Sequence, residues 1–87
     1  MKIVYHRAFK KGYKKLSNDA REKTRCAIEL FAKNPKHPSL RNHALTGRMK
    51  GLRSIRVTSD VRIIFKEREG YLIVIFLDVG GHNEVYR

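Results

Sequence analysis

The sequence predicts a single α+β domain of order β-α-α-β-β-β, in which a helical hairpin packs on one face of a small antiparallel sheet. Two helical patterns near the start and three strand patterns in the second half lead to this fold class. The length of 87 residues corresponds to one domain, and a hydrophobic content of 41% supplies a small core. We therefore assign residues 1–87 to one domain. The same apolar content excludes a disordered basic tail.

The first part of the chain is expected to form a strand and two helices. Lys2–His6 alternates apolar and other residues, which predicts a short strand. An i, i+4, i+7 apolar pattern predicts an amphipathic helix over residues 7–16; its members are Phe9, Tyr13 and Leu16. Ser17 is a favourable N-cap for a second helix, which Asn34-Pro35 ends. Residues 34–50 are loop-like because proline, asparagine and glycine recur in them.

The second part is expected to form a meander. Leu52–Thr58 and Val61–Lys66 have strand patterns, joined by a tight turn at Ser59-Asp60. Tyr71–Val79 is apolar on both faces, which predicts an interior strand. After two glycines, His82–Tyr86 is expected to add an edge strand or a turn. With the hairpin on one face, the other face stays partly open, and a function that uses the sheet should use that open face.

The charge of the chain predicts anionic partners. Twenty Lys and Arg against eight Asp and Glu give a formal net charge of +12. The first 41 residues hold twelve of these cations and only three carboxylates. Such a field attracts phosphate polymers and speeds encounter with them. Charge alone does not separate DNA from RNA, or either from an acidic protein.

Several classes of protein are excluded by what the sequence lacks. The single cysteine, Cys26, cannot form an internal disulfide, and neither a CxxC motif nor a close pair of histidines indicates a metal site. No P-loop or dinucleotide fingerprint indicates a cofactor. No apolar run approaches the ~18 residues of a membrane span, and no signal-peptide core begins the chain. We expect a cytoplasmic protein without cofactor or metal.

Five basic residues are candidates for contact with phosphate. Arg56 and Arg62 lie inside predicted strands between apolar neighbours, so alternation turns both toward the open face. Two such arginines on adjacent strands favour a phosphate clamp over ordinary exposed arginines. Arg48 and Lys50 lie in the loop that leads into the meander and are expected mostly to position phosphates. Arg53 lies at a strand start, where alternation is a weak guide to its face, and is a third candidate for binding nucleic acid.

Four further residues are candidates for proton transfer or base contact. His82 follows a double glycine, and histidine titrates near neutrality, which suits proton transfer; the alternative is an ordinary loop histidine. Tyr86 either stacks on a base or serves packing. His43 lies in the long loop and alone indicates little. Asp60 suits the chemistry of its turn without any catalytic role.

Five segments follow one another in an order typical of one family: Asn34-Pro35, Leu40–Gly47, Gly51–Val57, Asp60–Phe65 and Gly81–Tyr86. With them the chain resembles the RelE/YafQ-type toxins of bacterial type II toxin–antitoxin modules, of the RelE/ParE superfamily. The resemblance spans nearly the whole chain and implies a RelE-like fold. It also implies a ribosome-dependent endoribonuclease that cuts mRNA in the A site. In that reaction the RNA 2′-hydroxyl attacks the adjacent phosphate without a metal.

The resemblance implies roles for six residues. His43 and Asp60 match positions for the base, and His82 matches a candidate general acid. Arg62 matches an arginine on the scissile phosphate, and Tyr86 an aromatic residue in contact with RNA. Arg56 stands where the YafQ-like branch has a histidine and near a basic residue of the RelE-like branch; with Arg62 it would stabilise the phosphorane. Val61 departs from the family, because many members have an aromatic residue there.

The resemblance also implies binding partners and two alternative functions. An acidic antitoxin is expected to wrap the helices or cover the site, and ribosome and mRNA are the targets. The toxin alone is expected to be a monomer that does not enter membranes. One alternative is a ParE-like toxin that inhibits gyrase without nuclease activity, since such members share the fold. The other is an inactive RNA-binding relative.

Overall fold

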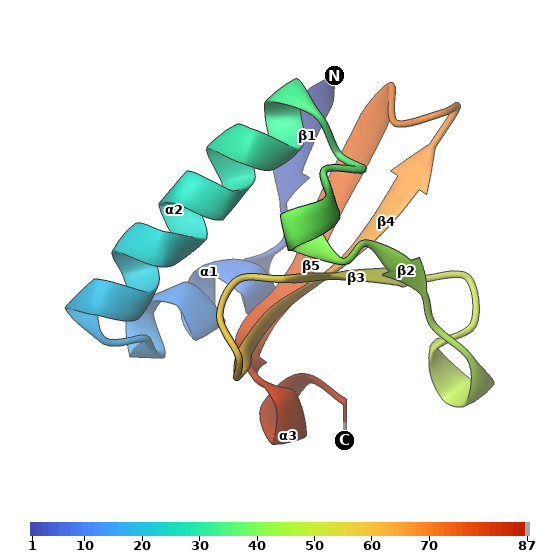
Figure 1. The fold of residues 1–87 in the computed structure, drawn as a ribbon. Coiled ribbons are helices and arrows are strands. Elements are labelled where there is room, and N and C mark those ends of the chain that lie inside the picture. Colours follow the sequence, from blue (N-terminus) through green and yellow to red (C-terminus); the bar gives the residue numbers. More distant parts are fainter. Residues whose placement is uncertain (87) are drawn as a thin grey trace.

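The computed structural model describes residues 1–86 as a sheet with two long helices on one side and a short helix at the end of the chain (Figure 1). The helices and strands are β1 (Lys2–Tyr5), α1 (Arg7–Lys15), α2 (Asn18–Lys33), β2 (His43–Ala44), β3 (Arg53–Arg56), β4 (Val61–Arg68), β5 (Ile73–Gly81) and α3 (His82–Val85). Two 3-10 turns, Pro38–Leu40 and Gly47–Met49, lie on either side of β2. The predicted α+β class is confirmed, with α1 and α2 as the predicted hairpin.

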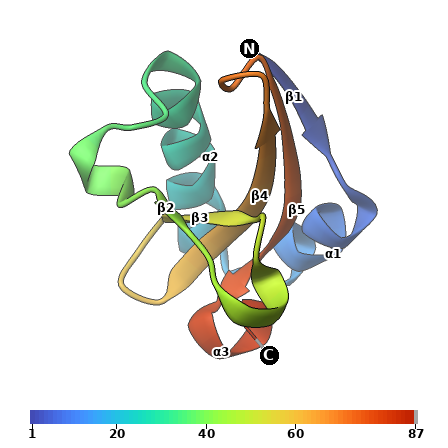
Figure 2. The same ribbon diagram turned by 90° about the vertical axis from the view of Figure 1, so that its right-hand side faces the viewer.

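The sheet has the strand order β1-β5-β4-β3-β2 (Figure 2). The meander of β3, β4 and β5 is antiparallel, as predicted, whereas β1 runs parallel to β5, which makes the sheet mixed. The two helices make this parallel pairing possible, because they carry the chain away from the end of β1 to the far edge of the sheet. Strand β5 has a neighbour on both sides, in agreement with its apolar pattern.

Two segments differ from the sequence prediction. Within the expected loop 34–50, His43 and Ala44 pair with β3 and form a fifth strand at the edge of the sheet. His82–Tyr86, expected to be an edge strand or a turn, contains the single turn of helix α3. Both segments are too short for a periodic pattern, so their conformation depends on tertiary contacts.

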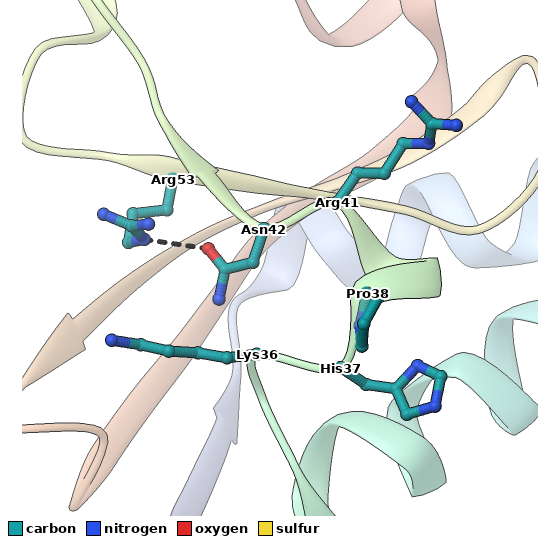
Figure 3. A pocket seen from close by; sticks show the side chains of 6 residues that line it. All are labelled: Lys36, His37, Pro38, Arg41, Asn42 and Arg53. Carbon is teal, nitrogen blue, oxygen red and sulfur yellow. Dashed lines mark hydrogen bonds between the residues drawn. The ribbon is translucent and has the colours of Figure 1, made fainter.

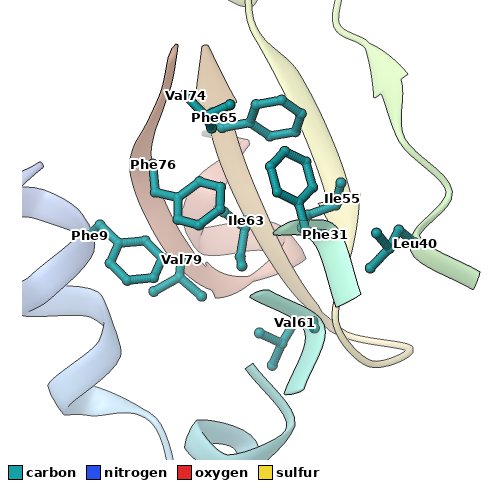
Figure 4. Close-up of a cluster of buried hydrophobic side chains, with 11 residues drawn as sticks. Phe9, Phe31, Leu40, Ile55, Val61, Ile63, Phe65, Val74, Phe76 and Val79 are labelled. Atoms are coloured by element: carbon teal, nitrogen blue, oxygen red, sulfur yellow. The ribbon is translucent and has the colours of Figure 1, made fainter. Parts of the chain in front are cut away.

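The core lies between the helices and one face of the sheet (Figure 4). Phe31 of α2 is fully buried, with ring centroids 5.1 Å from Phe65 and 5.5 Å from Phe76. Helix α1 approaches β5 so closely that a Cβ on Gly12 would lie 2.3 Å from the backbone oxygen of Val79. The absence of a side chain at Gly12 therefore permits this packing.

The opposite face of the sheet is partly covered by α3. Ile64 and Val85 are buried, yet both lie outside the main core cluster. Helix α3 contacts β4 and β5, and a Cβ on Gly80 would lie 3.5 Å from the Val85 side chain. We call this side of the sheet the open face. The part of it that α3 leaves uncovered lies over β3 and β2.

Candidate active site

Cross-strand pairing places the candidate residues on the open face. Ile55 and Ile63 pair with each other and lie in the core, so alternation turns their neighbours on β3 and β4 toward the open face. Arg56, at the end of β3, also lines a hollow together with residues of α2. Ser54 stands opposite His43 in the β2–β3 pair. Directly opposite residues of an antiparallel pair share a face, so His43 lies on the open face beside Ser54.

The two strand arginines form a pair on this face. Arg56 stands opposite Arg62. The Arg56 Nε donates to the backbone oxygen of Thr58 (3.3 Å), and the Arg62 Nη1 donates to the same oxygen (2.5 Å). Two half-buried guanidinium groups therefore converge on one carbonyl oxygen. Their remaining N–H groups match the geometry of a phosphate anion.

Tyr86 and His82 approach the same face from α3. The Tyr86 hydroxyl and the Ser54 hydroxyl share a hydrogen bond of 2.5 Å. The His82 and Tyr86 rings meet edge to face, with centroids 4.4 Å apart and an interplanar angle of 64°. Burial of Val85 anchors the helix that carries both rings. Because Ser54 and Arg56 are two residues apart on one strand, the phenol lies about 7 Å along β3 from the arginine pair.

Asp60 connects the β3–β4 turn to α3. Its carboxylate accepts a hydrogen bond from the backbone N–H of His82 (3.3 Å), where the four-residue helix begins. The Asp60 backbone N–H in turn donates to the Thr58 hydroxyl (3.2 Å). The carboxylate thus has a structural partner in α3, while the Thr58 hydroxyl closes the turn itself by accepting the N–H groups of Asp60 and Val61.

One hydrogen bond of His43 indicates which ring nitrogen carries a proton in the neutral ring. Its Nδ1 lies 2.8 Å from the backbone oxygen of Arg41, which can only accept, so Nδ1 carries the proton. In the neutral ring the exposed Nε2 then has a free lone pair.

Arg41, whose oxygen holds this ring, adopts a left-handed conformation with φ of 49°, at the end of the Pro38–Leu40 turn. The other two histidines that precede it, His6 and His37, accept backbone N–H groups at helix starts.

The other three basic candidates divide between the two faces. Arg48 shares a hollow with Tyr86; Leu45, Thr46 and Met49 complete its lining. Lys50 is exposed at the end of the same 3-10 turn. Arg53 lies on the helix side, since it pairs with the core residue Phe65, and its Nε donates to the Asn42 side chain (2.8 Å). The structure therefore separates Arg53 from the other candidates.

Sequence reasoning missed two polar groups that organise the site. Ser54 is fully buried and holds the Tyr86 phenol, while the Thr58 oxygen holds both guanidinium groups. Ser54 carried one signal, because it alternates with Ile55 as Arg56 does. A backbone oxygen carries no sequence signal.

Neither a metal site nor a membrane span is found among residues 1–86. No group of three His, Cys, Asp or Glu side chains there is arranged to hold a metal ion. No helix in this part of the chain is both long and apolar enough to cross a bilayer.

The same fold is found in solved structures of bacterial toxins. YafQ from E. coli strain BL21(DE3) superposes with a TM-score of 0.82, at 22% identity over 98% of this chain and 97% of that chain. A chain of the E. coli DinJ–YafQ toxin–antitoxin complex gives 0.79, at 22% identity over 98% and 96%. A chain of the toxin–antitoxin complex RelBE2 from Mycobacterium tuberculosis gives 0.64, at 17% identity over 93% and 96%. At 17–22% identity, these likenesses establish that the chain has the fold of the RelE and YafQ toxins.

The family follows from the sequence itself. The family model described as the bacterial toxin YafQ of type II toxin–antitoxin systems matches residues 1–87. The chain belongs to this YafQ toxin family, which confirms the resemblance inferred from its segments. A comparison with curated proteins gives no significant match.

Proposed function

We propose that this toxin is a ribosome-dependent endoribonuclease that cleaves mRNA in the A site without a metal ion. The observation that carries the proposal is the presence on one face of the sheet of an arginine pair, a histidine whose Nδ1 is held by a backbone oxygen, and a histidine–tyrosine pair. An RNA phosphate bound by the arginines would have a candidate base, His43, and a candidate acid, His82, on the same side of the sheet.

The geometry supports a division of roles. The His43 Nε2 takes the proton of the RNA 2′-hydroxyl, whose oxygen attacks the adjacent phosphorus. Arg56 and Arg62 stabilise the negative charge of the phosphorane. His82 gives a proton to the leaving 5′ oxygen, so the products are a cyclic phosphate and a free 5′-hydroxyl. Tyr86, Arg48 and Lys50 hold the flanking nucleotides.

Asp60 is the weaker candidate for the base. Its carboxylate is engaged by the His82 N–H, whereas the His43 Nε2 is exposed. Asp60 then contributes by holding α3 in place, and with it the acid and the tyrosine.

Primer extension on mRNA in a translating extract tests the proposal. Wild type should leave cuts inside codons, and His43→Ala and His82→Ala should each reduce cutting by roughly 10²–10⁴-fold, the usual contribution of general acid–base catalysis. His6→Asn is the matched control, because asparagine keeps an N-cap acceptor on α1, away from the open face. Equal cutting by wild type and His82→Ala would remove the acid from the mechanism.

A gyrase assay separates the rival function. A toxin that inhibits gyrase should block DNA supercoiling by the purified enzyme and leave mRNA intact. We expect the reverse result, because gyrase binding gives no reason for a paired histidine and tyrosine beside two arginines.

We further propose that an acidic antitoxin holds the toxin silent. The DinJ–YafQ and RelBE2 structures are toxin–antitoxin complexes, and this chain carries an excess of cations. Helix α1 presents four lysines in one short stretch, at positions 10, 11, 14 and 15. Co-expression with the neighbouring gene product should give a stable complex and restore growth; a pulldown without any small acidic protein contradicts the proposal.

A further inference from the structure

A second basic hollow lies on the helix side of the sheet, where the connection from α2 to β2 passes β3 (Figure 3). We call it the edge pocket; its lining residues are Lys36, His37, Pro38, Arg41, Asn42 and Arg53. Arg53 pairs with the core residue Phe65, so the edge pocket and the candidate active site lie on opposite faces of β3. None of the residues assigned to catalysis lines it.

The charge of the edge pocket is not neutralised within the described part of the chain. Three of its lining residues are Lys or Arg, and none is Asp or Glu. The ion pairs found in residues 1–86 all lie on α2, and none involves Lys36, Arg41 or Arg53. Cations held together without a carboxylate favour an anionic ligand.

Asn42 holds the pocket in shape. Its Nδ2 donates to the backbone oxygen of Pro35 and to the Tyr71 hydroxyl, both at 2.9 Å. Its Oδ1 accepts the Nε of Arg53 at 2.8 Å. The bond to Arg53 holds the guanidinium at its Nε edge. The two terminal nitrogens of Arg53 can therefore donate to a ligand.

Lys36 flanks the same opening. Its backbone N–H is held by the Asn34 side chain (3.1 Å), and its ammonium lies 6.0 Å from the centroid of the Tyr71 ring. Figure 3 shows the Lys36 and Arg53 side chains extending to one side, with Asn42 between them, while Arg41 points away. Lys36 and Arg53 are thus the two cations that face a common space.

We infer that the edge pocket binds one phosphate of a nucleic-acid backbone, with the Arg53 guanidinium as a fork and the Lys36 ammonium as a second donor. An arginine fork and a lysine point charge are the usual phosphate ligands. The one ring in the lining, the His37 imidazole, is held at Ser39 and points away from Lys36 and Arg53 in Figure 3. The contact is therefore to phosphate alone and carries no sequence preference. A nucleic acid bound both in the edge pocket and at the open face would contact the two faces of the sheet at β3.

Titrations followed by amide NMR test the inference, first with inorganic phosphate and then with a short 2′-O-methyl RNA. The 2′-O-methyl group removes the nucleophile, so binding is measured whether or not the toxin cleaves RNA. Both probes should shift the amides of residues 36–42 and 53. Lys36→Gln and Arg53→Gln should each weaken RNA binding about tenfold, the effect of losing one charge-assisted hydrogen bond.

The control is Lys2→Gln, which removes an equal charge from an exposed position on β1, at the opposite edge of the sheet from β2. It should change RNA affinity by no more than about twofold, because physiological salt screens exposed charges more than ~8 Å apart. Lys36→Gln is decisive if Arg53→Gln perturbs the fold, because the Lys36 ammonium contacts the Tyr71 ring and takes part in no ion pair found in residues 1–86. Equal affinity of Lys36→Gln and Lys2→Gln overturns the inference. Stronger binding of oligoglutamate than of RNA at residues 36–42 also overturns it, in favour of an acidic protein.

Discussion

Ser54 holds the Tyr86 phenol against the open face, although the two residues lie far apart in the sequence. Ser54→Ala should lower the free energy of unfolding by about 1 kcal/mol, the net value of one hydrogen bond, and should reduce mRNA cutting. In urea denaturation, the Ser54→Ala/Tyr86→Phe double variant should be no less stable than the worse single variant. Ser59→Ala, in the exposed β3–β4 turn, is the control. Additive losses in the double variant would show that the two hydroxyls act independently.

Strand alternation predicted the positions of the arginines where the strand pattern was clear. Arg56 and Arg62 have apolar neighbours on both sides, so their face could be predicted from sequence. Arg53 begins its strand, and its first neighbour, Leu52, precedes β3. Arg53 and Ile55 are two residues apart on β3, so their side chains point to the same face of the sheet. That this face is the helix side follows only once Ile55 is known to lie in the core.

The Asp60 side chain holds helix α3 to the β3–β4 turn. Asp60→Ala removes the acceptor of the His82 N–H and should speed hydrogen exchange at the α3 amides and reduce cutting. Asp60→Asn keeps an acceptor oxygen but cannot act as a base, so it should cut mRNA within a few-fold of wild type. A loss of roughly 10²-fold or more in Asp60→Asn would instead assign the base to Asp60.

Helix α1 depends on the bare backbone of Gly12. Gly12→Ala would place a methyl group against the Val79 oxygen, a backbone atom that cannot rotate away. We expect a loss of about 1–3 kcal/mol in the free energy of unfolding, despite the higher helix propensity of alanine. Lys14→Ala, at an exposed position of the same helix, should be neutral in urea denaturation. A Gly12→Ala variant as stable as Lys14→Ala would contradict the close packing.

At the scale of the whole molecule, α2 and the sheet share one aromatic core. Phe31 meets the rings of Phe65, Tyr71 and Phe76 at 5.1–6.0 Å. Phe31→Ala should cost about 3–5 kcal/mol, a large part of the stability of a domain of this size. Thermal unfolding should show one cooperative transition at a lower temperature; an unchanged transition would mean that the core does not depend on this ring.

The whole-molecule arrangement was only partly predictable. The meander and the helical hairpin are local and follow from pattern and turn residues. The pairing of β1 with β5 joins residues about 70 positions apart, and no local pattern specifies it. His43, Tyr86 and the arginine pair reach one face of the sheet from segments far apart in the chain. Alternation indicated the face of the arginines only; their use together with His43 and Tyr86 rests on the family resemblance and stays a prediction.

The shared carbonyl of Thr58 holds the two guanidinium groups together before any ligand arrives. Each group spends only part of its N–H donors on that oxygen, so an incoming anion would bind the remaining donors of a pair that is already assembled. Because Asp60 in the same hairpin tip also holds the first N–H of α3, one short turn would link a ligand at the arginines to the helix that carries His82 and Tyr86.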